Sequence, residues 1–181
     1  LELAAWLYLP KGASGSAKRP AVVMAHGWSA VKEMYLDKFA ERFAQAGLVV
    51  VVFDYRTFGG SQGEPRGNII WYEQLEDYRN AITWVSARSD VDPARIGVWG
   101  TSYSGAHVLH LAAFDKRIKT VVSQMPPPAN WENYYAPMSQ KDREGMFAWL
   151  ADARAEQYAT GKVATFPVVS ADGKDAALTW L

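Results

Sequence analysis

The 181-residue sequence has no cysteine, no excess of either charge and no long apolar run. The absence of cysteine excludes disulfide bonds, thiol catalysis and cysteine metal sites. Because 19 basic and 19 acidic side chains balance, with no basic run among them, nothing favours nucleic acid or an anionic membrane as a partner. No apolar stretch approaches the ~20 residues that span a bilayer. We expect a globular domain of ordinary size, and composition leaves its compartment open.

The sequence does contain a serine in a setting typical of a nucleophile. A strand-like run, residues 95–99, precedes Ser102, and a helix-forming run follows it. This layout is typical of a nucleophile elbow, a strained strand-to-helix turn that holds a serine hydroxyl clear of the backbone. Gly100 supplies the small residue before the serine, whereas Ser104 stands where a second glycine is usual and Gly105 follows it. We interpret the segment as a variant of Gly-x-Ser-x-Gly.

Glycine-rich turns between a strand and a helix also bind phosphates, so two other motifs compete. A P-loop would continue with Lys and Ser or Thr after Gly105, but Ala106 and His107 follow. A dinucleotide-binding turn requires G-x-G-x-x-G, a spacing that the glycines around Ser102 do not give. The sequence therefore favours neither phosphate site. The alternative that remains on this segment is a tight turn with an incidental serine.

An upstream segment complements the serine. Residues 20–25 have the pattern of a short buried strand, and His26, Gly27 and Trp28 follow it. A loop after such a strand supplies one backbone N–H of an oxyanion hole, and the residue after the nucleophile supplies the other. We expect these two donors to be the N–H groups of Trp28 and Tyr103. His26 is expected to shape this loop rather than to act as a base.

The surrounding pattern predicts strands and helices in alternation. The all-apolar run at residues 48–53 is typical of a strand covered on both faces, and residues 118–124 predict the strand after the elbow. Asp92 and Pro93 are expected to turn the chain into the nucleophile strand. Two helices are predicted from apolar residues at three- and four-residue spacing. Their apolar faces comprise Tyr35, Phe39, Phe43 and Ala46 in the first helix, before Gly47, and Trp71, Leu75, Tyr78, Ile82 and Val85 in the second.

These motifs occur in the order found in α/β-hydrolases, and the chain resembles that superfamily from about Leu3 to Met125. The resemblance rests on the His26 turn, on Asp54 with the glycine-rich loop after it, and on the elbow around Ser102. It is closest to the dienelactone-hydrolase-like and acyl-peptidase-like branch, in which a tyrosine often follows the nucleophile. The resemblance implies an α/β fold with a mostly parallel sheet flanked by helices. It also implies acyl transfer to water through Ser102.

The character of the sequence changes after Met125. A proline run at residues 126–128 precedes an aromatic loop, and a helix is predicted from about Ser139 to Thr160, with Gly161 after it. In the resembling enzymes an insertion here forms a cap over the nucleophile. We therefore expect residues 1–125 to be the hydrolase core and residues 126–181 a cap. Three aromatic residues are candidates for the substrate pocket, although each could simply pack the cap: Trp131, Tyr134 and Tyr135.

The triad partners of Ser102 are not evident in the sequence. In α/β-hydrolases an acid and then a histidine follow the serine, but only His107 and His110 do so here. Both lie in the helix that leaves the elbow, where His107 is already ~7 Å along the axis from Ser102. Two explanations stay open. Either the chain is part of a longer protein that supplies both groups beyond Leu181, or it is a relative that binds without turnover.

The sequence thus predicts a serine hydrolase that cleaves a carboxylic ester or a related acyl substrate through an acyl-enzyme on Ser102. The alternatives are a peptidase or amidase of the same fold and a non-catalytic acyl-binding relative. We expect a small-molecule substrate, no cofactor and no metal, since the two histidines of the elbow helix have no evident acidic partner. The sequence leaves the oligomeric state and the substrate open.

Overall fold

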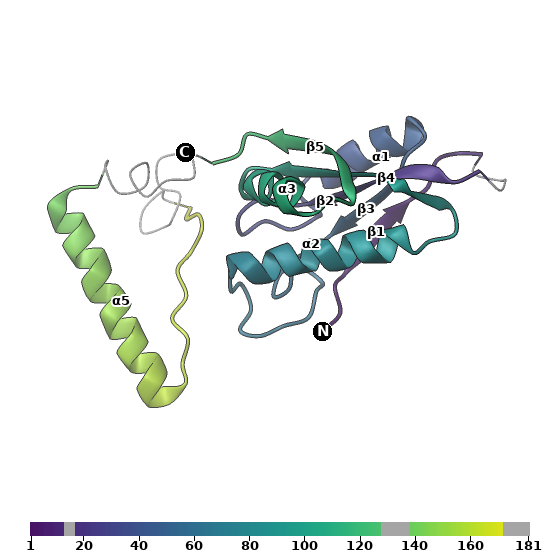
Figure 1. Ribbon diagram of the computed structural model, residues 1–181. Coiled ribbons are helices and arrows are strands. Elements are labelled where there is room, and N and C mark those ends of the chain that lie inside the picture. Colours follow the sequence, from purple (N-terminus) through teal and green to yellow (C-terminus); the bar gives the residue numbers. More distant parts are fainter. Residues whose placement is uncertain (13–16, 128–137, 172–181) are drawn as a thin grey trace. The chain divides into compact units, whose positions relative to one another are not determined.

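The structure, a computed structural model, describes residues 1–12, 17–127 and 138–171 (Figure 1). The chain divides into two compact units, Leu1–Pro127 and Pro128–Leu181. The described residues of the second unit contain α5 (Gln140–Thr160). The elements of the first unit are, in chain order, β1 (Ala5–Tyr8), β2 (Arg19–Ala25), α1 (Leu36–Gln45), β3 (Val49–Phe53), α2 (Trp71–Ser86), β4 (Val91–Thr101), α3 (Tyr103–Phe114) and β5 (Ile118–Gln124).

The strands of the first unit form one sheet in the order β1-β3-β2-β4-β5. The pairs β3–β2, β2–β4 and β4–β5 are parallel, and only the pair β1–β3 among the described strands is antiparallel. Parallel neighbours require crossover connections, which α1, α2 and α3 provide here. The predicted fold class, a mostly parallel sheet flanked by helices, is confirmed.

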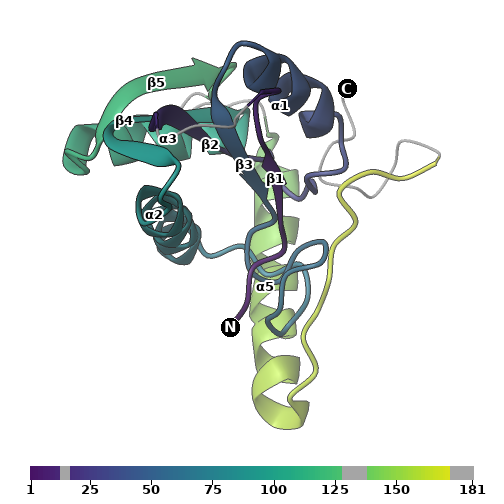
Figure 2. The same cartoon turned by 90° about the vertical axis from the view of Figure 1, so that its right-hand side faces the viewer.

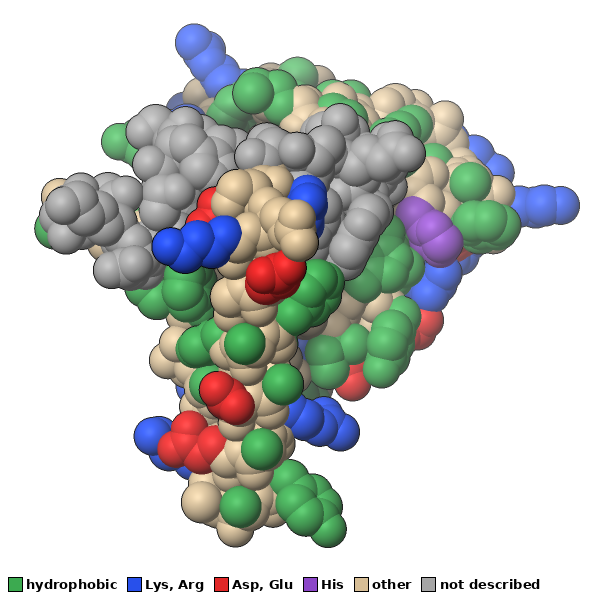
Figure 3. All heavy atoms as spheres, turned by 90° about the vertical axis from the view of Figure 1, so that its left-hand side faces the viewer, with side chains coloured by type: hydrophobic (Ala, Val, Ile, Leu, Met, Phe, Trp, Pro, Cys, Tyr) green, Lys and Arg blue, Asp and Glu red, His purple; other side chains and the backbone are tan. Residues whose placement is uncertain are grey.

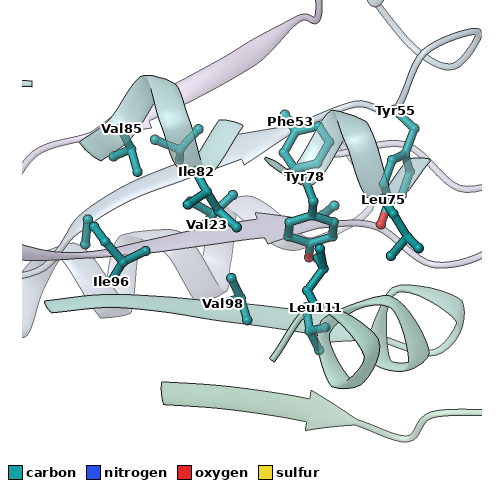
Figure 4. Close-up of a cluster of buried hydrophobic side chains, with 14 of the residues drawn as sticks. Val23, Phe53, Tyr55, Leu75, Tyr78, Ile82, Val85, Ile96, Val98 and Leu111 are labelled. Carbon is teal, nitrogen blue, oxygen red and sulfur yellow. The ribbon is translucent and has the colours of Figure 1, made fainter. Parts of the chain in front are cut away.

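Helices cover both faces of this sheet. Val50 and Val52 of β3 pack in one apolar cluster with α1, whereas Val49, Val51 and Phe53 point into a second cluster with α2 and α3. Figure 2 shows α1 and α2 on opposite sides of the strands, and Figure 4 shows the larger cluster. Because alternate side chains enter different cores, every residue of β3 must be apolar. The all-apolar run in the sequence has this origin.

The predicted apolar face of α2 is confirmed, but that of α1 is wrong by one position. The sheet-facing side chains of α1 are Leu36, Ala40 and Ala44, which are buried. Tyr35 instead precedes the helix at φ 65° and is 78% exposed. The two alanines let the helix axis approach the sheet closely, so the bulky Phe39 packs beside the contact, against Trp99, with 5.0 Å between ring centroids. The prediction relied on the large aromatic residues and therefore assigned the wrong helix face to the sheet.

The nucleophile strand begins earlier than predicted. Asp92 and Pro93 lie within β4 rather than in a turn before it. The pairing of β4 with β2 shifts register between Val91 and Ile96, so the proline lies in an irregular stretch that needs no ladder donor from it. The Asp92 carboxylate accepts the Ala94 N–H at 3.0 Å and supports this bulge. The turn-forming residues therefore bend a strand instead of ending one.

In the second unit, α5 has the boundaries that the sequence predicts. The Ser139 hydroxyl accepts the Asp142 N–H at 3.1 Å as an N-cap, and Gly161 ends the helix at φ 75°. No side chain of α5 is buried, and its apolar Phe147 and Leu150 are exposed. Figure 3 shows apolar and charged side chains interspersed on the surface. The cap role of this unit stays a prediction. No described helix is long and apolar enough to cross a membrane.

Candidate active site

Ser102 lies between the end of β4 and the start of α3, at φ 52° and ψ −122°. A serine in this backbone region is strained by roughly 1–3 kcal/mol, a cost that persists only where the surroundings hold the conformation. The Ser102 side chain is exposed, although β4 before it is largely buried. The turn thus presents a hydroxyl at the surface on a backbone that cannot relax freely.

Two backbone hydrogen bonds hold the turn from either side. The Ser102 N–H donates to the Gln124 carbonyl at the end of β5, at 2.9 Å. The Ser102 carbonyl accepts the Gly105 N–H at 2.7 Å, within the first turn of α3. The strained residue is therefore attached both to the neighbouring strand and to its own helix.

The small residues around Ser102 are required by close contacts. A Cβ at Gly100 would lie 2.2 Å from the Ser104 carbonyl oxygen, a distance that no side chain tolerates. A Cβ at Gly105 would lie 3.2 Å from the Gln124 carbonyl oxygen, so this glycine lets α3 approach β5. Ser104 is fully buried, and its hydroxyl forms hydrogen bonds with two tyrosine hydroxyls. The departure from Gly-x-Ser-x-Gly thus separates two tasks, close approach at position 105 and hydrogen bonding at position 104.

The loop after β2 lies against the nucleophile. A Cβ at Gly27 would lie 3.1 Å from the Ser102 Cβ and 3.7 Å from its Oγ atom, so glycine leaves the space beside the hydroxyl open. Trp28 follows this glycine, and its N–H donates to no protein acceptor within the described part of the chain. Tyr103 is the first residue of α3, where backbone N–H groups point out of the helix end. The two predicted oxyanion donors thus belong to the two segments that meet at Ser102.

A buried ion pair anchors the far end of this loop. The Asp54 carboxylate, which is fully buried, accepts the Lys32 Nζ at 2.6 Å and the Lys32 backbone N–H at 2.7 Å. It also accepts the Gly60 N–H at 3.0 Å. Gly59 beside it has φ 49°, and a Cβ there would lie 2.1 Å from the carboxylate. Asp54 therefore ties the loop at residues 27–32 to the glycine-rich loop after β3.

His26 is engaged at both ring nitrogens. Its Nδ1 lies 2.9 Å from the Gly27 carbonyl, which can only accept, so Nδ1 carries the proton. Its Nε2 accepts the Tyr55 N–H at 3.3 Å. Burial lowers the pKa of His26, which keeps the ring neutral in this arrangement. A ring with both nitrogens engaged holds the loop after β2 and is a poor candidate for the base.

The two histidines of α3 contact groups other than the Ser102 hydroxyl. His107 donates from Nδ1 to the Tyr103 carbonyl at 2.9 Å and stacks on Trp71 with ring centroids 4.1 Å apart. Its buried Nε2 has no partner among the described residues, and burial lowers its pKa to about 4. His110 packs against Phe114. No hydrogen bond joins a histidine to the Ser102 hydroxyl in the described ranges.

The structure thus brings together Ser102, Trp28 and Tyr103, which the sequence had singled out. Trp131, Tyr134 and Tyr135 lie outside the described residues. Two features were missed, the Lys32–Asp54 pair and the buried hydroxyl of Ser104. A signal existed for the first, because a carboxylate that directly follows an all-apolar strand needs a buried partner. For the second the signal was weaker, a serine in place of an expected glycine.

Comparison with known proteins identifies the family. The family model of X-Pro dipeptidyl-peptidase (S15 family) matches residues 1–169. The chain belongs to the S15 family. The α/β-hydrolase superfamily predicted from the sequence is confirmed by this match together with the solved structures that share the fold. The order of loop, strand and serine described above is therefore that of a hydrolase family.

Individual relatives are similar over the same region. The quorum-quenching protein AidA of Acinetobacter baumannii is 43% identical over 126 residues, 70% of this S15 chain and 40% of the relative. The thiohydrolase aneE of Aspergillus aculeatus is also 43% identical over 126 residues, 70% and 38% respectively. A hypothetical protein of Pseudomonas aeruginosa has a similar crystal structure, with a TM-score of 0.85 at 30% identity, covering 98% of this chain and 56% of that one. The chain thus spans about half the length of these relatives.

Proposed function

We propose that the protein is a serine hydrolase that cleaves an acyl ester or thioester through an acyl-enzyme on Ser102. One observation carries the proposal: an exposed serine is held at φ 52° directly beside a glycine whose missing side chain leaves its Oγ accessible. A strained backbone conformation at an exposed residue, where packing does not require the strain, indicates a functional position. The thiohydrolase among the similar proteins supports an acyl substrate, since it shares 43% identity over the region that contains the turn.

In this mechanism Ser102 attacks the acyl carbonyl carbon, and the carbonyl oxygen becomes an oxyanion. The N–H groups of Trp28 and Tyr103 stabilise that charge, and collapse of the adduct expels the alcohol or thiol. Water then releases the acid and restores the serine. Because the described histidines are engaged elsewhere, we propose that the base and its orienting acid belong to a part of the whole protein outside this sequence. The relatives are about twice as long.

The test is fluorophosphonate labelling of the whole protein, since only an activated serine reacts quickly. Ser102→Ala should abolish both labelling and ester or thioester turnover while leaving thermal stability unchanged. Ser123→Ala is the matched control, because Ser123 lies on β5 and its hydroxyl donates to the Gly105 carbonyl. A Ser102→Ala protein that keeps most of its turnover would falsify the assignment.

The oxyanion donors act through the backbone, so side-chain changes at Trp28 should matter little and loss of its N–H should matter much. Trp28→Pro removes the donor and should lower kcat by ~10²–10³, whereas Trp28→Phe should keep most of it. Unfolding midpoints measured for both variants separate lost catalysis from added strain. Equal kinetic effects of the two substitutions would place the oxyanion hole elsewhere.

We propose that three aromatic residues that follow β5 in the sequence help to select the acyl group. Trp131→Ala, Tyr134→Ala and Tyr135→Ala should each change the preference between short and bulky acyl groups, because large aromatic side chains define pocket shape. The measurement is kcat/KM for a series of esters of increasing acyl length. A parallel loss for all substrates, in step with thermal stability, would assign these residues to packing.

A second candidate is peptidase action, which the description of the matched family favours. It uses the same serine and the same oxyanion donors and differs in the leaving group, an amine instead of an alcohol or thiol. Turnover of an Xaa-Pro aminoacyl amide, compared with that of a short ester and of an acyl thioester, separates the two. A higher kcat/KM on the amide would replace the first proposal by the second.

A further inference from the structure

A chain of three buried hydroxyl groups spans the nucleophile turn. The Tyr55 hydroxyl lies 3.1 Å from the Ser104 Oγ, which lies 2.9 Å from the Tyr78 hydroxyl. The Tyr78 hydroxyl in turn lies 2.8 Å from the Trp99 carbonyl oxygen. All three hydroxyl residues are at most 1% exposed, and the two tyrosine rings lie within the larger apolar cluster (Figure 4). We call these three groups and the carbonyl the hydroxyl chain.

The direction of the hydroxyl chain follows from its last member. A carbonyl only accepts, so Tyr78 donates its proton to Trp99. The Tyr78 oxygen is then the acceptor for the Ser104 proton, and the Ser104 oxygen accepts the proton of Tyr55. Every hydroxyl donates once, and the hydrogen bonds run one way from Tyr55 to Trp99. Bonds aligned in this manner polarise and strengthen one another in a low-dielectric interior.

The members of the hydroxyl chain come from four different segments of the first unit. Tyr55 follows β3, Tyr78 belongs to α2, Trp99 to β4 and Ser104 to α3. In the sequence, Trp99 lies three residues before the nucleophile and Ser104 two residues after it. The hydroxyl chain therefore connects Trp99, near the end of β4, to Ser104 in the first turn of α3, on either side of the strained Ser102.

The protons of the hydroxyl chain stay in place over the whole physiological range. Burial raises the pKa of Tyr55 and of Tyr78 well above that of an exposed tyrosine. Neither hydroxyl ionises, so neither introduces a charge beneath the turn. A permanent set of neutral donors is suited to holding geometry and unsuited to moving a proton.

We propose that Ser104, Tyr78 and Tyr55 are positioning residues that hold Ser102 in its strained conformation through the hydroxyl chain. They touch no substrate and act through the backbone on both sides of the turn. Ser104 replaces the usual glycine because its hydroxyl is the central member of the chain. The expected effect of these residues on the rate rests on the proposed function. Their expected effect on the rigidity of the turn does not.

The direction of the chain predicts an order of effects. Tyr78→Phe removes both the acceptor for the Ser104 proton and the donor to the Trp99 carbonyl. No hydrogen bond then connects Ser104 to Trp99. Tyr55→Phe removes only the first donor and leaves the connection from Ser104 to Trp99 intact. We expect kcat of the whole protein to fall about tenfold in Tyr78→Phe and about twofold or less in Tyr55→Phe, with KM unchanged in both. Ser104→Ala should resemble Tyr78→Phe, and Ser104→Thr should restore part of the rate.

A stability-matched control distinguishes positioning from general weakening. Ile82→Val removes one methyl group from the same helix and the same cluster without touching a hydroxyl. Amide hydrogen exchange is measured at Ser102, whose N–H donates to the Gln124 carbonyl, and at Gly105, whose N–H donates to the Ser102 carbonyl. Each variant is measured at an equal interval below its unfolding midpoint. Tyr78→Phe should speed this exchange at least tenfold relative to Ile82→Val.

The two measurements together decide between the proposals. If Tyr78→Phe and Ile82→Val change exchange at the turn equally, the hydroxyl chain is packing alone and the positioning role is overturned, whatever the activity. If exchange responds as expected but the wild-type protein turns over no ester, thioester or amide, the proposed function fails and the positioning role stands. Faster exchange together with a lower kcat at constant KM supports both.

Discussion

Lys32→Met breaks the buried ion pair that anchors the loop after β2. The substitution keeps most of the side-chain length and can keep the contact with the Trp6 ring, over which Nζ lies 4.9 Å from the centroid. What is lost is the charge 2.6 Å from the Asp54 carboxylate. Because Asp54 has no exposure to solvent, its charge would be left with only backbone N–H donors.

The expected loss of stability is large. Removing one partner of a buried pair costs about 3–5 kcal/mol, since an uncompensated charge remains in the interior. For a protein of this size the unfolding midpoint should fall by roughly 6–20 °C. Adding Asp54→Asn to Lys32→Met removes the stranded charge and should recover part of the loss.

The assay is thermal unfolding followed by near-ultraviolet circular dichroism, with urea titration at 25 °C as a second measure. Lys38→Met is the matched control, because the Lys38 side chain is 66% exposed and pairs only with surface carboxylates among the described residues. It should leave the midpoint unchanged within error. Equal unfolding midpoints for Lys32→Met and Lys38→Met would refute the reasoning. So would a double variant, Lys32→Met with Asp54→Asn, that unfolds at a lower temperature than Lys32→Met alone.

Three further outcomes are expected. Gly27→Ala places a Cβ 3.1 Å from the Ser102 Cβ and should lower kcat at least about tenfold with a small change in unfolding midpoint; unchanged kinetics would show that the loop after β2 moves freely. Because burial lowers the pKa of His107 to about 4, its contribution of about 3 kcal/mol is present above pH 6.5 and is lost as the pH falls towards 4. His107→Asn should therefore flatten the fall of stability across that interval in urea titrations, and an unaltered slope would contradict this. Ser139→Ala removes the N-cap of α5 and should reduce its helicity by circular dichroism at a cost of about 1 kcal/mol, whereas Ser139→Asp should not.

Much of the first unit was predictable because strands and helices alternate along the chain from β2 to β5. β3 could be identified from its composition, and β5 from its position after the elbow helix. The sheet-facing side of α1 could not be identified from the sequence. Aromatic residues recur along one face of this helix, and small residues recur one position later along the neighbouring face. The helix face that contacts the sheet depends on the distance between the helix axis and the sheet. That distance is set by the packing of the whole unit.

The site was predictable in part for a similar reason. Ser102 and Gly27 could be identified since backbone strain and close approach demand particular residues at fixed positions in a local motif. Lys32 and Asp54 are 22 residues apart, and Tyr78 and Ser104 are 26 apart. Such pairs are brought together only by the topology of the sheet. A single sequence shows that each polar group needs a partner, but not which partner it finds.

The exposed side chain of Ser102 at the start of α3 also makes the turn accessible to selective chemistry. Because the 181 residues contain no cysteine, Ser102→Cys would introduce a single thiol, located at a helix N-terminus that favours its thiolate form. A maleimide or a fluorinated alkylating tag would then modify one defined atom. Spectroscopic probes could report from the nucleophile position itself, without first removing native thiols from these residues.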